Sequence, residues 1–218
     1  MARKKNKNPS IVDTSRVHLG LPQVGDLLAD LFPAPAIEVL RQPFRSWQNL
    51  IAAFIRLLQW QRLDFHMQYQ QQRNWCWAAV ATSVAQFYDP ASAWTQCALA
   101  NGELGRDDCC GPGASGPCNV YGYLDSSLDR VGRLDHWSPG TATFAQSQAE
   151  TDGGRPLGVR TAWSGGGSHF LCIIGYQIID NMLAVDDPFF GRSDVDYATF
   201  AGSYQGSGKW TDTYYTRA

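Results

Sequence analysis

The stretch N-W-C-W-A-A-V-A-T-S-V-A-Q-F-Y-D-P, residues 74–90, constrains the fold more than any other part of the chain. Its apolar residues recur at helical spacing, and Pro90 prevents the helix from continuing. Asn74 is a suitable N-cap, so we expect a largely buried helix with Cys76 in its first turn. Unpaired backbone N–H groups and the helix dipole favour a thiolate there. Cys76 is therefore a candidate nucleophile, although a lone free cysteine is commonly just a buried apolar residue.

A cysteine nucleophile needs a base, and His169 is the histidine that heads an apolar strand pattern, in G-G-G-S-H-F-L-C-I-I-G-Y. The other three histidines lie in polar or irregular sequence. A second apolar run, M-L-A-V-D-D-P, ends in Asp186 and Asp187, and Asp180 and Asn181 supply turn residues for a hairpin between the two runs. A thiol on a helix start, with an imidazole and a carboxylate on adjacent strands, is the arrangement that base-activated thiol chemistry requires.

These motifs, with W-T-Q-C-A-L-A-N, G-R-P-L-G-V-R and V-D-D-P-F-F-G, resemble a bacterial family of papain-like cysteine proteases. That family includes type III effector proteases of plant pathogens and more distantly resembles the double-glycine leader peptidases. The resemblance extends from about Phe65 to the C-terminus and implies Cys76 as nucleophile, His169 as general base and acid, and Asp187 as the residue that orients the imidazole. Papain has asparagine in the third role. The family also implies an oxyanion-binding glutamine about six positions before the cysteine, which selects Gln70 among several neighbouring glutamines.

The resemblance implies a cysteine peptidase that cleaves peptide bonds through a thioester acyl-enzyme. Two alternatives stay open at this point. The same residues could act on a side-chain amide, as in a deamidase or transglutaminase, or Cys76 could be a core residue of a non-catalytic binding module. We expect a protein or peptide substrate, a monomer and no cofactor. If the protein is an exported effector or toxin, a secretion-system protein or an immunity protein is a further expected binding partner.

The order of the expected elements indicates an α+β fold, because helical patterns come first and strand patterns follow. A catalytic helix packed on an antiparallel sheet is also the papain-like arrangement that the resemblance implies. A loop is expected around residues 138–140. The expected strands are residues 156–163, 169–179, 182–187, 193–200 and 210–216.

Composition excludes several classes of function. The 218 residues carry a net charge of only −2, which gives no support to nucleic-acid binding. The apolar stretch of residues 50–60 is too short for a transmembrane helix and contains Arg56. No apolar run follows the basic tip of the chain, so an ordinary secretion signal is not visible. We expect export by another route, with a cytoplasmic location as the alternative.

Residues 1–64 are expected to be an extension of a catalytic domain at residues 65–218. An amphipathic helix is predicted at about residues 46–63, capped by Ser46, with Leu50, Phe54, Leu57 and Leu58 on its apolar side. Leu50, Phe54 and Leu58 are expected to dock on the domain. It could be a pro-region over the cleft, a targeting segment, or a helix packed permanently on the domain. The first 65 residues hold nine Lys and Arg against five Asp and Glu, whereas the remainder holds nine against fifteen, and this opposite charge favours docking.

Four further cysteines cluster in and beside a Gly- and Pro-rich loop, namely Cys97, Cys109, Cys110 and Cys118. We expect them to pair among themselves, which leaves Cys76 and Cys172 free and suits an oxidising compartment. Zinc is the weaker alternative, since adjacent cysteines lack the usual C-x-x-C spacing, and reduced thiols are the third. The remaining glycine run and acidic pairs lack the spacing of phosphate or calcium loops, so no metal site is predicted.

Overall fold

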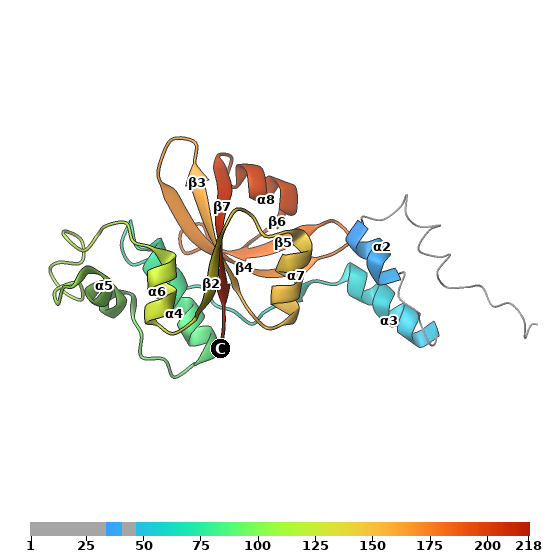
Figure 1. Ribbon diagram of the computed structural model, residues 1–218, viewed down its shortest axis with the longest axis horizontal. Helices are drawn as coiled ribbons and strands as arrows, with labels where there is room; N and C mark the ends of the chain where they lie inside the picture. The colour runs from blue at the N-terminus through green and yellow to red at the C-terminus, as the bar shows by residue number, and fades with distance from the viewer. Residues whose placement is uncertain (1–33, 41–46) are drawn as a thin grey trace, which may run out of the picture.

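The computed structural model describes residues 34–40 and 47–218, which form helices on both sides of one antiparallel sheet (Figure 1). The seven-stranded sheet has the order β2-β7-β3-β4-β5-β6, and the short β1 pairs with β4. The strands are β1 (Gln61–Arg62), β2 (Leu134–Pro139), β3 (Leu157–Trp163), β4 (Ser168–Gln177), β5 (Met182–Asp186), β6 (Ser193–Asp196) and β7 (Gly208–Thr216).

The helices separate into two groups that cover different faces of this sheet (Figure 1). On one face lie α4 (Cys76–Tyr88), α5 (Gln96–Leu104) and α6 (Leu124–Arg130). The other group comprises α2 (Ala34–Leu40), α3 (Trp47–Leu58), α7 (Phe144–Asp152) and α8 (Tyr197–Ser203). Each group encloses its own hydrophobic core against the sheet. The predicted α+β class, with the helix of Cys76 packed on an antiparallel sheet, is confirmed.

Strand β4 contributes to both cores, which explains its unbroken apolar sequence. Phe170, Cys172 and Ile174 pack in the core beside α4. Leu171 and Ile173, which alternate with them, pack in the core on the opposite face. Successive side chains of a strand point to opposite faces, so a strand covered on both sides must be apolar at every position.

The helix predicted at residues 46–63 is shorter than expected. Position 46 lies outside the described residues, and α3 ends at Leu58. The chain then becomes extended, and β1 pairs with Tyr176 and Gly175 of β4. A Cβ atom at position 175 would lie 2.5 Å from the carbonyl oxygen of Gln61, so the close approach of β1 requires glycine there. Pairing with the sheet therefore replaces the last turn of the predicted helix.

The docking side of α3 agrees with the prediction only in part. Leu57 is fully buried, and Leu50 packs partly against the same core. Phe54 and Leu58, which were predicted to dock, are 39% and 52% exposed. Apolar residues occur around much of this helix, so sequence spacing could not distinguish Leu57 from its neighbour as the buried residue.

Among the helices of the described residues, none is long and apolar enough to cross a membrane.

Candidate active site

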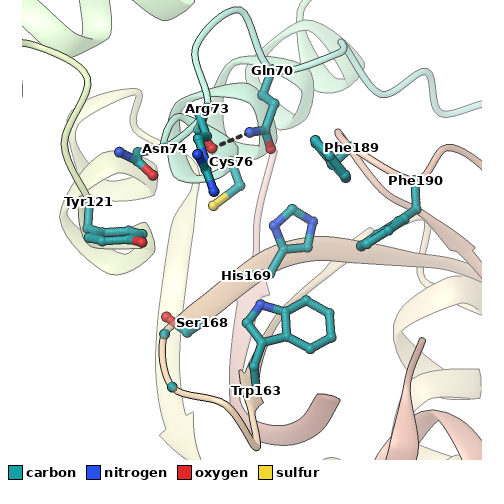
Figure 2. A pocket seen from close by; sticks show the side chains of 12 residues that line it. Gln70, Arg73, Asn74, Cys76, Tyr121, Trp163, Ser168, His169, Phe189 and Phe190 are labelled. Carbon is teal, nitrogen blue, oxygen red and sulfur yellow. Dashed lines mark hydrogen bonds between the residues drawn. The ribbon is translucent and has the colours of Figure 1, made fainter. Parts of the chain in front are cut away.

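A cavity of about 230 Å³ lies where the start of α4 faces the beginning of β4 and the loop after β5 (Figure 2). Its walls combine a thiol, an imidazole, amides and several aromatic rings. The lining residues are Gln70, Arg73, Asn74, Cys76, Tyr121, Trp163, Gly166, Gly167, Ser168, His169, Phe189 and Phe190. Two elements distant in sequence, the α4 start and β4, thus bring Cys76 and His169 to one cavity.

Cys76 is the first residue of α4 and is 5% exposed. The predicted N-cap was wrong: Trp75 occupies the cap position, and no side chain caps the helix. Asn74 instead donates its side-chain amide to the backbone carbonyl of Asn119 at 2.8 Å. Among the described residues, no backbone carbonyl accepts the N–H of Cys76. The thiol therefore lies in the first turn, as predicted, beside a backbone donor that is available to a ligand.

His169 is 7% exposed and is held on three sides. Its Nε2 lies 2.8 Å from Asp187 Oδ1, which leaves Nδ1 for the side of the ring that faces Cys76 (Figure 2). The indole of Trp163 stacks on the imidazole at a centroid distance of 6.1 Å, and Phe190 meets it edge to face at 6.0 Å. These rings restrict the orientation of the imidazole and limit its contact with water.

The environment of His169 favours its protonated form. Burial by itself would lower the pKa of His169, but the hydrogen bond to Asp187, the interaction with Cys76 and the charges of both partners raise the pKa from 6.5 to about 9. His169 therefore holds its proton more strongly than a free imidazole does.

Asp187 is 1% exposed, and both of its carboxylate oxygens are occupied. Besides His169, Oδ1 accepts the backbone N–H groups of Phe189 and Phe190 at 2.7 and 2.8 Å. Oδ2 accepts the hydroxyl of Tyr204 at 2.9 Å. A buried carboxylate with this many donors is fixed in position.

Tyr204 was not among the residues singled out by sequence. It follows α8 and is 2% exposed. Burial and the nearby carboxylate of Asp187 raise the pKa of Tyr204, so the phenol remains protonated and continues to donate. No sequence motif surrounds this tyrosine. It contacts Asp187 because α8, which Tyr204 ends, packs beside the strand that leads to Asp187.

The neighbouring Asp186 has a different role. Its Oδ2 accepts from Arg192 at 2.9 Å and from the backbone N–H of Met67 at 3.3 Å. Arg192 also donates to the carbonyl of Phe65. Asp186 therefore fastens the chain before α4 to the sheet, whereas Asp187 faces His169.

Gln70 is the glutamine of its segment that lines the cavity. Its Nε2 donates to the backbone carbonyls of Gln72 and Arg73 at 3.1 and 2.6 Å. Its Oε1 is buried and makes no hydrogen bond within the described part of the chain. Gln68 instead bonds to Gln86 and Gln96 outside the site. The amide of Gln70 is therefore in place, but it would have to rotate to offer an N–H to the cavity.

The cysteines outside the site form two disulfides, Cys97–Cys110 and Cys109–Cys118, so the predicted pairing among these four is confirmed. Cys109 and Cys118 lie near Asp108, but their sulfur atoms are joined to each other and offer no thiolate to a metal ion. Cys76 and Cys172 are free, as predicted. Complete burial and nearby carboxylates raise the pKa of Cys172 well above its ordinary value.

A sequence model described as the Peptidase_C39 like family matches residues 62–212. No curated protein matches the chain. Among solved structures, a double glycine motif protease from an AMS/PCAT transporter, crystallised in complex with the leader peptide, is similar at 14% identity and a TM-score of 0.44. That alignment covers 72% of this chain and 94% of the protease.

Proposed function

This chain belongs to the Peptidase_C39 like family, a family of cysteine peptidases, and we propose that it hydrolyses peptide bonds with Cys76, His169 and Asp187 as its catalytic triad. The observation that carries the assignment is the hydrogen bond between His169 and the buried Asp187, in a cavity that also contains a free thiol. Each group has the partner that its role requires: the thiol has a base, and the base has an orienting carboxylate.

In the proposed acylation step, the sulfur of Cys76 attacks the scissile carbonyl carbon and the carbonyl oxygen becomes an oxyanion. The N–H of Cys76 lies at the open end of α4 and is the first donor to that oxyanion. Gln70 is the proposed second donor, and its side chain has to move so that Nε2 leaves the carbonyls of Gln72 and Arg73 and faces the cavity.

His169 then delivers its proton to the leaving nitrogen, and the C–N bond breaks to give a thioester on Cys76. In the second half of the reaction, neutral His169 takes a proton from water, whose oxygen attacks the thioester. The acid product leaves and the thiolate–imidazolium pair is restored. Asp187 keeps Nε2 protonated, so that Nδ1 is the nitrogen that exchanges protons with substrate and water.

We also propose that residues 65–218 form the catalytic unit and that residues 1–64 are an extension, with α3 docked through Leu57. The two disulfides support export into an oxidising compartment, where a role as effector or toxin is the proposed setting.

The proposal is tested by alkylation of Cys76 with iodoacetamide across pH, with peptide mapping to identify the labelled thiol. Cys76 should label rapidly at pH 6, and His169→Ala should slow the labelling sharply because the positive charge beside the thiol is lost. Cys172 is the internal control and should remain almost unlabelled, since it is fully buried.

A peptide substrate then separates hydrolysis from side-chain amide chemistry. A new N-terminus is the expected product, and Cys76→Ala should abolish its formation. Release of ammonia without chain cleavage would contradict the proposed reaction, and retention of cleavage by Cys76→Ala would exclude Cys76 as its nucleophile.

A further inference from the structure

The loop closed by the Cys109–Cys118 disulfide follows α5 in the chain, and its end lies beside the start of the helix that carries Cys76. Both half-cystines are fully buried in the core beside α4. At the other end of the loop, the side chain of Asn101 accepts the backbone N–H of Cys109 at 2.8 Å. The loop is therefore fixed at both ends, by α5 and by the disulfide.

Hydrogen bonds connect the end of this loop and the two residues after it to the first turn of α4 and to the residues just before it. Asn119 Oδ1 accepts the backbone N–H of Asn74 at 3.0 Å, and its backbone carbonyl accepts the side chain of Asn74 at 2.8 Å. The carbonyl of Cys118 accepts the indole N–H of Trp75 at 2.7 Å. The carbonyl of Val120 accepts the indole N–H of Trp77 at 3.2 Å.

These contacts replace the capping that α4 lacks. A capping side chain fixes the first turn of a helix by accepting one of its N–H groups, and α4 has none. The loop instead holds residues on both sides of Cys76 and leaves its N–H free.

We propose that Asn119 is a positioning residue for Cys76, and that the Cys109–Cys118 disulfide acts through it. This inference rests on the proposed function, since it concerns the placement of the proposed nucleophile. Without the Asn119 side-chain acceptor, the chain before Cys76 loses one of its three hydrogen bonds to Cys118 and Asn119, and the thiol moves relative to His169. A displacement of that kind lowers reactivity without removing any reacting group.

The test compares Asn119→Ala with Asn119→Asp in the full-length protein, using the pH profile of iodoacetamide labelling together with kcat and KM for a peptide. In Asn119→Ala, labelling at pH 6 and kcat should each fall about tenfold, as expected for one lost hydrogen bond, with KM nearly unchanged. Asn119→Asp keeps an acceptor at the same position and should retain more of the kcat than Asn119→Ala.

Asn101→Ala is the matched control, because it removes an equivalent asparagine-to-backbone bond at the other end of the loop. It should lower the melting temperature without altering the pH profile of labelling. Likewise, Cys109→Ala/Cys118→Ala should reproduce the effect of Asn119→Ala, whereas Cys97→Ala/Cys110→Ala should not. These alanine pairs leave no free thiols from the removed disulfide that could confuse the labelling.

Two outcomes would overturn the inference while leaving the proposed function intact. One is an Asn119→Ala protein whose labelling profile matches the wild type. The other is an equal loss in Asn119→Ala and Asn101→Ala, which would mean that both bonds only stabilise the loop. Failure of the proposed function is distinct, because Cys76 would then react slowly in the wild-type protein as well.

Discussion

Replacing Asp187 by asparagine isolates the contribution of a single negative charge to this site. Asparagine has nearly the same shape, and its oxygen can still accept from His169 and from the two backbone N–H groups now bound to Oδ1. Its NH₂ group would face Tyr204, whose hydroxyl can turn and accept instead of donating. The hydrogen-bond network can therefore survive while the charge beside His169 is removed.

The expected effect follows from the pKa of His169, which is about 9. The imidazolium that protonates the leaving nitrogen is present below this pKa and is lost above it, so wild-type kcat/KM should decline as pH rises through about 9. Hydrogen bonds to charged groups contribute roughly 1–1.5 kcal/mol more than neutral ones, and 1.36 kcal/mol corresponds to one pKa unit. In Asp187→Asn the alkaline decline should therefore move to about pH 8.

The assay is the pH dependence of kcat/KM for one peptide, with iodoacetamide labelling measured in parallel. Asp187→Asn should reduce turnover more than labelling, because every turnover needs His169 to gain and release a proton, and the lost carboxylate charge is what stabilises its protonated form. Asp186→Asn is the matched control, since its carboxylate pairs with Arg192 and not with His169. An unchanged alkaline decline in Asp187→Asn, or an equal displacement in Asp186→Asn, would refute this account of the site.

Two further substitutions test the support around the site and the attachment of the N-terminal helix. Tyr204→Phe removes one donor from Asp187 and should lower kcat about fivefold to tenfold at constant KM; a change in KM alone would contradict a positioning role. Leu57→Ala, at a fully buried position, should lower the free energy of unfolding by about 3 kcal/mol in denaturant titrations, whereas Leu58→Ala, which is 52% exposed, should change it by no more than about 0.5 kcal/mol. Equal losses for both leucines would mean that α3 docks differently from the structure.

The parts of the fold that sequence predicted well are those with strong local patterns. The helix after Cys76 and the strand after His169 are long, apolar and ended by recognisable breakers. The choice of Asp187 comes from the family resemblance, and in the structure its carboxylate faces His169 while Asp186 faces Arg192.

The elements that sequence missed depend on tertiary contacts. Strand β2 contains a histidine, a proline and several polar residues, and it forms because β7 pairs along its length. The predicted strand at residues 193–200 ends at Asp196, whose side chain accepts the N–H of Thr199 and begins α8. The aromatic and β-branched residues of α8 favour a strand by local propensity, but the Asp196 cap stabilises a helix there instead.

Two features of the site could not be obtained from local patterns at all. Asn74 has a side chain suited to capping, but in the structure both that side chain and its backbone N–H are hydrogen-bonded to Asn119, which is far away in sequence. Tyr204 reaches Asp187 only because α8 returns the chain beneath β5. Both are contacts between residues distant in sequence, which a helical or strand period does not encode.

The packing of β4 in both cores bears on when this protein can act. Local opening of a protein usually begins at its periphery, whereas a central strand loses its hydrogen bonds only when most of the structure is lost. His169 is on that strand, and Cys76 belongs to a helix that covers one of its faces. A partly unfolded chain therefore has no assembled pair of thiol and imidazole. The proposed activity can therefore begin only after the sheet and α4 have folded together.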